Sequence, residues 1–289
     1  MPTFSPAFSQ LRACTERALA VLAAPGLSDE RVHEARKALK RARACLRLLR
    51  PALDRADYRG ANAGLRDAGR CLAPLRDAHS QLELLQRCRQ AYDSQALDDL
   101  ARDTAAERDR AQQHLADTRE RALCRRHIER AQRHCQPAAQ SGTQPLRRGL
   151  RDVYRKARKA FRNVTAQPTP ALRHEWRKQV KYLRNAASVL HEAGIRGLGK
   201  PIKRLVRIAE LLGDDHDLVV LRQALQSRAA EADEVLASIG QRAARLSTQA
   251  LRLGDKSFVL KSRQFAPSKR AFERATRGAS SNSAGASPT

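Results

Sequence analysis

The sequence predicts an all-α protein built from two related, pseudo-symmetric helical-bundle repeats. Its 289 residues are rich in Ala, Leu, Arg and Gln, whereas there are only 14 Gly and 12 Pro. Alanine and straight-chain residues favour helices, and the β-branched residues that favour strands are sparse. Between Pro- and Gly-containing breaks, apolar residues recur at steps of three and four, which places one apolar stripe on a helix. We therefore expect two bundle-like halves packed into one elongated unit.

A first helix is predicted from Ser28 to about Pro51. Ser28 is a favourable N-cap, and the acidic residues Asp29 and Glu30 follow in the first turn, where negative charge suits the helix dipole. Proline at position 51 ends the helix because it lacks the backbone N–H. The apolar stripe of this helix comprises Val32, Ala35, Leu39, Ala42, Leu46 and Leu49.

The stretch RHEWRKQVKYLR at 173–184 repeats the pattern of VHEARKALKRAR at 32–43, at an offset of 141 residues. The Leu, Arg and Asp positions of LAPLRD at 72–77 similarly match LGDDHD at 212–217, at an offset of 140 residues. Two segments at nearly one offset indicate an internal duplication. We expect a single domain over residues 1–277, with repeats at about 1–140 and 146–277. The apolar stripe of the second copy is Trp176, Val180, Leu183, Ala187 and Leu190.

Two segments of low apolar content lie between the repeats and after the second one. The stretch QPAAQSGTQP at 136–145 is predicted to link them, because it is rich in turn-forming and polar residues. Residues 278–289 are predicted to be a disordered tail, since they are too polar to pack. The basic segment from Lys256 to Arg277 is expected to continue as helix.

Cations form a band on each of the two matching helices, about 120° around the helix from the apolar stripe. A solvated helix face gains about 0.2–0.5 kcal/mol from each pair of opposite charges at i,i+4, whereas these bands place like charges together at a similar cost. We therefore interpret them as one binding surface for a polyanion, where Arg donates forked hydrogen bonds to phosphate and Lys acts as a point charge. The first band is Arg36, Lys40, Arg43, Arg47 and Arg50, with His33 and Lys37 at its edge; the second is Arg177, Lys181 and Arg184, with His174 and Lys178.

The second half carries additional cations. One row is Arg148, Arg151, Arg155, Arg158 and Arg162; another, on a predicted short helix beginning near Pro201, is Lys200, Lys203, Arg204 and Arg207. The first-half positions aligned with the last three of these are Ala63, Gly64 and Asp67, so we expect the stronger anion contacts in the second repeat. The nearby GIRGLGK at 194–200 has the spacing of a phosphate loop, but Pro201 replaces its Ser/Thr and no strand precedes it. We interpret it as a turn between helices.

The formal net charge of +26 indicates an anionic partner: nucleic acid, an acidic membrane surface or an inorganic polyanion. Aromatic residues make up only 4% of the chain, which leaves few platforms for stacked bases, so nonspecific nucleic-acid binding is the alternative rather than the leading hypothesis. Six cysteines without a CxxC pair, no signal-peptide pattern and no apolar run of about 18 residues predict a cytoplasmic protein with no membrane partner.

The histidines leave several interpretations open. His33 and His174 could ligate metal, act as general acids or donate hydrogen bonds, but neither has a matching ligand at i+4. His216 lies in GDDHD at 213–217, where a site for a hard cation is an alternative. We favour a polar helix junction in which Asp217 bonds backbone or a neighbouring basic helix, and Asp77 does the same in the first half. Phosphoryl transfer needs a metal held by carboxylates and a positioned nucleophile. The only acidic cluster that could meet this need is Asp214, Asp215 and Asp217 in GDDHD, which is weak support for catalysis. We therefore expect no enzyme, no metal and no cofactor.

These motifs resemble the CHAD family, the conserved histidine α-helical domain. The segments that carry the resemblance, in family order from about Leu11 to Arg274, are VHEARKALKRARACLRLL, LRHEWRKQVKYLRNAASVL, LAPLRD, LLGDDHDL and LRLGDKSFVLKSRQFAPSKRAF. The resemblance implies two pseudo-symmetric bundles that bind inorganic polyphosphate on a basic surface near the symmetry axis, and association with polyphosphate granules. Family members are often fused to a triphosphate-tunnel domain, for which this sequence has no counterpart.

Carried onto this sequence, the family's basic positions are His33, Arg36, Lys37, Lys40, Arg43, His174, Arg177, Lys178, Lys181 and Arg184. To these the charge pattern adds Arg47, Lys200, Lys203, Arg204 and Arg207 as expected polyphosphate contacts. The first repeat departs from the pattern at Ala73–Pro74, where glycine is expected, and it lacks a counterpart of the 200–207 row. Unequal use of the two repeats is therefore expected.

Overall fold

The computed structural model describes residues 6–24, 26–92, 94–135, 143–226 and 233–275, and this part of the chain is helical without strands. The all-α prediction is confirmed. The first half contains α1 (Pro6–Ala23), α2 (Asp29–Leu49), the short 3-10 helix η1 (Arg50–Ala52), α3 (Arg55–Cys71), α4 (Ala73–Arg89), α5 (Gln95–Ala116) and α6 (Thr118–Arg133). The second contains α7 (Thr143–Ala166), α8 (Pro170–Glu192), α9 (Gly199–Gln226), α10 (Asp233–Phe258) and α11 (Ser262–Phe265).

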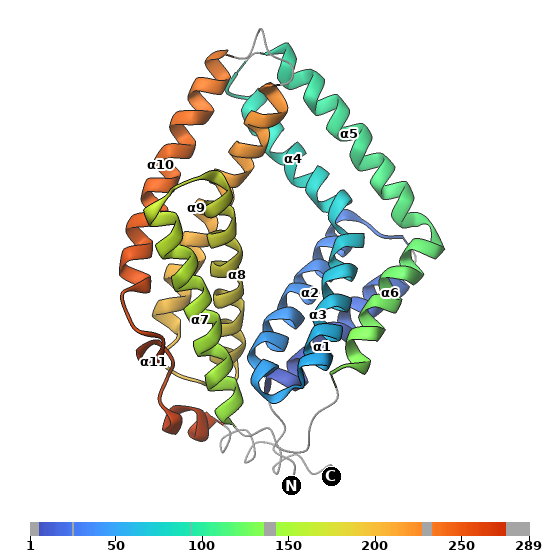
Figure 1. Ribbon diagram of the computed structural model, residues 1–289. Helices are drawn as coiled ribbons and strands as arrows, with labels where there is room; N and C mark the ends of the chain where they lie inside the picture. Colours follow the sequence, from blue (N-terminus) through green and yellow to red (C-terminus); the bar gives the residue numbers. More distant parts are fainter. Residues whose placement is uncertain (1–5, 25, 93, 136–142, 227–232, 276–289) are drawn as a thin grey trace, which may run out of the picture.

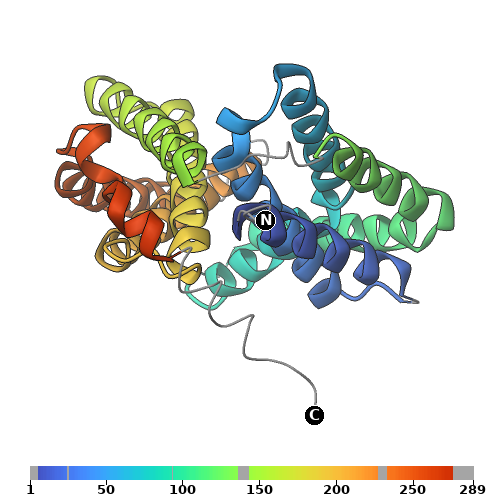
Figure 2. The same ribbon diagram turned by 90° about the horizontal axis from the view of Figure 1, so that it is seen from below.

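The two halves lie side by side and join at two places, so that the long helices frame a closed outline (Figure 1; Figure 2, from below). At one junction α2 packs against α7 and α8 within a large apolar core that draws on both halves. At the far end, α4 and α5 meet α9 and α10 in a smaller core that includes Leu85, Leu97, Leu221 and Ile239. The apolar stripes predicted for residues 28–51 and 173–190 are buried throughout. Their burial turns the cation bands away from the core.

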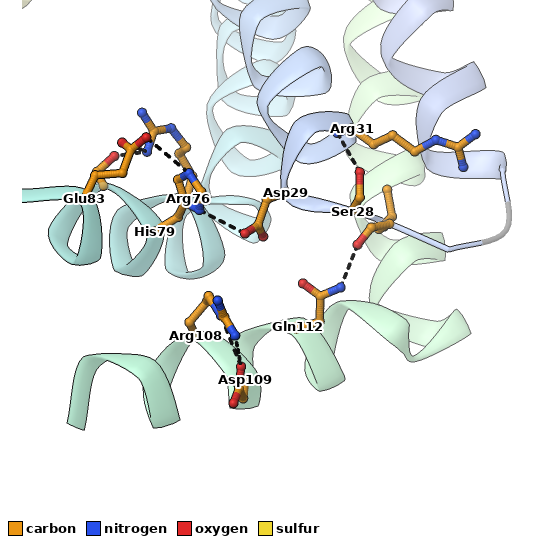
Figure 3. A network of polar contacts seen from close by, with 11 residues as sticks. Ser28, Asp29, Arg31, Arg76, His79, Glu83, Arg108, Asp109 and Gln112 are labelled. Carbon is orange, nitrogen blue, oxygen red and sulfur yellow. Dashed lines mark hydrogen bonds and ion pairs between the residues drawn. The ribbon is translucent and has the colours of Figure 1, made fainter. Parts of the chain in front are cut away.

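The start of α2 is fixed by polar contacts from three elements (Figure 3). Ser28 Oγ caps the helix by accepting a hydrogen bond from the backbone N–H of Arg31 at 3.4 Å. Asp29 lies 2.9 Å from His79 Nδ1 on α4, and Gln112 of α5 donates to the carbonyl of Leu27 at 2.9 Å. The N-cap predicted at Ser28 is confirmed, and these contacts orient the helix that carries the first cation band.

The prediction of a short helix after Pro201 and of a helix junction at GDDHD was wrong. A single helix, α9, runs from Gly199 to Gln226 through both segments. The first half does break at the aligned place: α3 ends at Cys71 and α4 starts at Ala73, with Pro74 in its first turn. Proline cannot donate the hydrogen bond that would continue α3, whereas the second half has Asp214 at that position.

The helix expected to continue from Lys256 to Arg277 is interrupted: α10 ends at Phe258, α11 covers Ser262–Phe265, and residues 269–275 are helical again. The start of the predicted linker, 136–142, and the predicted tail, 278–289, lie outside the described residues, and Thr143 already belongs to α7. In the described part of the chain, no helix has the length and apolar composition needed to cross a membrane.

A close approach of α7 to α2 predicts a stability effect at Gly149. A Cβ built there would overlap the backbone carbonyl of Leu48, which cannot move away as a flexible side chain could. We expect Gly149→Ala to lower the free energy of unfolding by about 1–3 kcal/mol, although alanine is the better helix former. Gly69→Ala in α3 is the control, because a Cβ there meets nothing within 4 Å.

Denaturant unfolding of the two glycine variants checks this prediction. Gly69→Ala should be more stable than the parent by about 0.4–1 kcal/mol, because alanine reduces the freedom of the unfolded chain. If Gly149→Ala is stabilising by a similar amount, α2 and α7 are not in contact at this point.

Candidate anion-binding surface

The cation bands of α2 and α8 meet at the junction of the two halves. We call Arg36, Lys40, Arg43 and Arg47 of α2, together with Arg177, Lys181 and Arg184 of α8, the paired cation bands. Lys40 experiences the positive charge of Arg177, and Lys181 experiences that of Lys40, so the charges act across the junction as well as along each helix. Lys40 and Lys181 are the aligned members of the two copies. The structure thus brings together two stripes that lie 141 residues apart in the sequence.

The two lysines are held with unusually low pKa values. Desolvation by the surrounding protein is the largest cause for both; neighbouring cations add to it, and the pKa falls to about 8 for Lys40 and about 7 for Lys181. The side chain of Lys40 is nevertheless exposed, which fits a concave environment that is open to solvent but surrounded by protein. Among the described residues, neither lysine has an ion-pair partner within 4.0 Å. Asp77 and Asp217 only partly offset the effect of burial and of the neighbouring cations on the two lysines.

The aspartates near these lysines are associated with arginines. Asp77 of α4 lies 3.5 Å from Arg36, and Asp217 of α9 lies 4.0 Å from Arg177. Arg36 also donates to the carbonyl of Gly69 at 3.3 Å. Burial lowers the pKa of Arg36 and Arg177 and raises the pKa of Asp217. These contacts orient the two guanidinium groups, and the same aspartates act on Lys40 and Lys181 only from beyond ion-pair distance.

Tyr182 of α8 supports the far end of the α2 band. The guanidinium carbon of Arg47 lies 3.6 Å from the centre of its ring, and that of Arg43 lies 5.8 Å away. A cation over an aromatic face is attracted by the ring quadrupole, more strongly when desolvated. Arg47 also donates to the carbonyl of Arg43 at 2.7 Å. The tyrosine therefore organises two arginines, and its ring face is occupied by them.

A histidine pair links α8 to α9 beside the bands. His174 Nδ1 lies 3.3 Å from His216 Nδ1, so one imidazole donates a hydrogen bond and the other accepts it. Burial is the main cause that lowers the pKa of both, to about 4 for His216, and Arg177 lowers both further. Both rings are thus favoured in the neutral form near pH 7. In the first half, burial lowers the pKa of His33, and Arg76, which occupies the position aligned with His216, lowers it further.

An ion pair also connects α8 to α9, one residue before the histidine on each helix. Arg173 Nε donates to Asp215 Oδ2 at 2.8 Å, and the two side chains are 14% and 3% exposed. Arg173 also donates to the carbonyl of Pro168 at 2.7 Å, so it joins α8 to both α9 and the start of its own helix. Within the part of the chain that the structure describes, no group of three or more His, Cys, Asp or Glu is arranged to hold a metal.

Comparison with a sequence model of the CHAD domain matches residues 4–226, about three quarters of the chain. This chain belongs to the CHAD domain family. The match excludes the segment LRLGDKSFVLKSRQFAPSKRAF at 251–272, so that part of the resemblance is not covered by the family model. CHAD domains are a family of binding domains, and polyphosphate binding is a known property of the family.

Two solved structures share the fold. PptA from Streptomyces chartreusis has a TM-score of 0.59 and 19% identity, over 90% of this chain and 98% of the other. The CHAD domain from the plant Ricinus communis has a TM-score of 0.56 and 21% identity, over 91% and 92% of the two chains. No curated protein matched the sequence.

Several residues expected at the site of this CHAD domain lie outside the paired cation bands. Lys200, Lys203 and Arg204 are exposed on the first turns of α9, where Arg204 donates to the carbonyl of Lys256 at 3.4 Å. Arg207 is connected to the bands indirectly, because it pairs with Glu210 at 3.3 Å. The charge of Glu210 in turn partly offsets the lowering of the Arg184 pKa by burial. Involvement of the 200–207 row in binding stays a prediction.

The edge residues of the two bands also separate from them. His33 and Lys37 line a hollow of about 500 Å³ that α1, α2 and Glu192 of α8 enclose, together with the carboxylate of Glu34. Lys178 pairs with Glu175 at 2.5 Å on its own helix. Lys178 is therefore paired with an acid, and His33 and Lys37 share their hollow with the carboxylates of Glu34 and Glu192.

Sequence reasoning missed four residues that build this surface: Arg41, Arg76, Arg173 and Tyr182. Arg41 pairs with Glu192 across the junction of α2 and α8, and Arg173 pairs with Asp215. Arg41, Arg173 and Tyr182 lie in the two repeated helical segments, and each contacts a residue on another helix. Periodicity within one helix could therefore not distinguish these three from solvated residues.

Proposed function

We propose that this protein binds inorganic polyphosphate without catalysing its turnover, and that the chain of phosphates lies along the paired cation bands. The observation that carries the proposal is the pair of lysines, Lys40 and Lys181, which are desolvated, lie close enough to repel each other and have no ion-pair partner among the described residues. Gathering like charges at a desolvated place costs stability in the free protein. A bound polyanion offsets that cost. The clustering of like charges therefore favours a binding role for the bands over the alternative of a simply solvated helix face.

The chemistry of polyphosphate fits this surface. Polyphosphate is a thin, flexible chain of closely spaced charges without bases, so it requires cations along a line and no platform for stacking. The seven cations of the bands provide that line from two helices. Tyr182 is an aromatic residue at the bands, and one face of its ring is covered by Arg47. Single-stranded nucleic acid gains much of its affinity by stacking bases on free aromatic rings, and this ring is already occupied.

Charge-removal variants test the proposal. Lys40→Gln with Lys181→Gln is the informative pair, because neither lysine has an ion-pair partner to leave exposed. We expect polyphosphate affinity to fall at least about tenfold, since hydrogen bonds to charged groups contribute about 1.5–3 kcal/mol each. Titration calorimetry with a long polyphosphate measures the change. The control, Arg125→Gln with Arg126→Gln on α6, removes equal charge from exposed residues that have no ion pair.

Two further arms of this experiment separate the alternatives. Lys200→Gln with Lys203→Gln tests the row on α9; a loss equal to that of the central lysines would extend the site to it. Double-stranded DNA of equal charge concentration tests selectivity, with both polyanions titrated at two salt concentrations because release of counterions makes such binding fall with salt. Equal affinity for the two polyanions, or equal losses in all variants, would show a nonspecific basic surface instead.

A binding module of this kind would also place the protein on polyphosphate granules in the cell. We propose this localisation as a consequence of the same surface. A fluorescent fusion should coincide with granules, and Lys40→Gln with Lys181→Gln should disperse it. Retention of the variant on granules would mean that another surface directs the protein there.

A further inference from the structure

The cationic row of α7 forms a second basic site, apart from the paired cation bands. A hollow of about 850 Å³ lies between α7 and the segment that contains α11. Its walls carry Arg155, Arg158, Lys159, Arg162, Lys261 and Arg263, and the rest of its lining is Asn163, Ala166 and Ser262. No carboxylate and no aromatic ring lines it. We call this hollow, with its continuation described next, the outer groove.

The outer groove continues toward the start of α7. A neighbouring hollow of about 370 Å³ shares Arg155 and Ser262 with the first and adds Arg147, Arg148 and Arg151. Asp152 is its single carboxylate. The row at 148–162, recognised in the sequence, is thus the floor of an extended basic depression on one long helix.

Few of these charges are neutralised within the described residues. Asp152 pairs with Arg155 at 2.7 Å, and this is the one ion pair among the cations of the outer groove. Arg158 and Arg147 donate through Nε to the carbonyls of Phe258 and Pro267, each at 2.9 Å. These bonds hold the guanidinium groups in place but leave their charge uncompensated. The other cations have no acidic partner within the described chain.

The wall opposite α7 is held rigidly by a buried tyrosine. Tyr154 is completely buried, and its hydroxyl donates to the carbonyl of Leu260 at 3.0 Å and lies 3.3 Å from that of Ser257. Its ring stacks on Phe265 of α11 with centroids 4.1 Å apart. The segment that carries Lys261 and Arg263 is therefore positioned before any ligand arrives, which lowers the entropic cost of binding.

A negative charge lies on one path between this site and the paired cation bands. Between α7 and α8 lies a smaller hollow of about 190 Å³, lined by Lys156 and Lys159 on one side and by Glu175 and Gln179 on the other. Glu175 accepts hydrogen bonds from Lys178 and Gln179. A polyanion that passed from one site to the other along this path would meet a carboxylate.

We propose that the outer groove is a second binding site for linear phosphate polyanions, which takes a separate short polyphosphate or a second segment of a long one. This inference rests on the proposed function for the ligand class. The shape and charge of the groove carry the site itself: nine cations, one carboxylate and no ring on which a base could stack. Forked arginines arranged along a line can bind successive phosphate groups.

The test counts the bound ligands. Titration calorimetry with tripolyphosphate, which is short enough to occupy one site, should give two molecules per protein for the parent. Lys159→Gln, Arg162→Gln and Arg263→Gln change exposed side chains that form no ion pair, and this triple variant should bind one. The matched control is Arg125→Gln, Arg126→Gln and Arg130→Gln on α6, also exposed and equal in charge, which should still bind two.

The outcomes distinguish this inference from the proposed function. If the outer triple variant and the α6 control both bind two, or the parent binds only one and loses it with Lys40→Gln and Lys181→Gln, the outer groove is not a site. If the lysine variant changes nothing and the outer variant abolishes binding, the proposed role of the bands fails while the outer groove stands. If double-stranded DNA loses affinity as much as tripolyphosphate in the outer variant, selectivity for polyphosphate is overturned.

Discussion

At pH 9 the protein is expected to bind polyphosphate at least about tenfold more weakly than at pH 6. In the free protein the pKa is about 7 for Lys181 and about 8 for Lys40. Both lysines are charged at pH 6, and both have lost most of their charge at pH 9. Affinity falls by about tenfold per pH unit above the free pKa of each lysine until the pH reaches its pKa in the complex, so Lys181 contributes up to about a hundredfold.

The sign of this effect follows from proton linkage. A bound phosphate favours the charged ammonium, so the pKa of each lysine is higher in the complex than in the free protein. Binding therefore takes up protons between the two values, and affinity decreases as the pH rises through the free-protein pKa. Calorimetry in two buffers of different ionisation enthalpy measures this uptake directly.

Arginine at the same positions provides the control. Lys40→Arg with Lys181→Arg keeps both charges at pH 9, because arginine stays protonated throughout this range. The variant should bind with nearly constant affinity between pH 6 and 9. An affinity of the parent that is equally constant would show that the two lysines do not contact the ligand.

Removal of Asp215 is expected to destabilise the protein by about 3–5 kcal/mol, the usual cost of breaking one side of a buried ion pair. Asp215 is 2% exposed and is the carboxylate partner of Arg173. In Asp215→Ala, the buried guanidinium would keep its charge without a counterion. The loss should appear as a lower denaturant midpoint with an unchanged slope.

The neighbouring Asp214 is the matched control for this substitution. It is exposed and forms no ion pair with the described cations around it, so Asp214→Ala should change stability by less than about 0.5 kcal/mol. Because α8 and α9 are joined by the Arg173–Asp215 pair, Asp215→Ala should also weaken polyphosphate binding by displacing the α8 band. Equal stability of the two variants would mean that Arg173 is not buried as the structure has it.

Most of the helices around the bands could be predicted because their causes are local. Ser28, the acidic first turn and Pro51 lie within a single segment, and together they define α2. The repeated stripe identified Trp176 and Val180 as core residues, and both are completely buried. Prediction failed at GDDHD, where α9 stays helical and the partner of Asp215 is Arg173, which lies 42 residues away in the sequence.

The sequence by itself determined the all-helical class, the apolar faces, the two cationic bands and the excess of positive charge, because each depends on spacing of a few residues along one helix. Only the tertiary structure decided that Lys40 and Lys181 face each other, that Arg47 covers Tyr182, and that α11 completes a groove with α7. Those relations join residues on different helices, and they depend on how the apolar faces pack. Helical periodicity fixes the direction of a side chain around its own axis, whereas packing decides which charges then become neighbours.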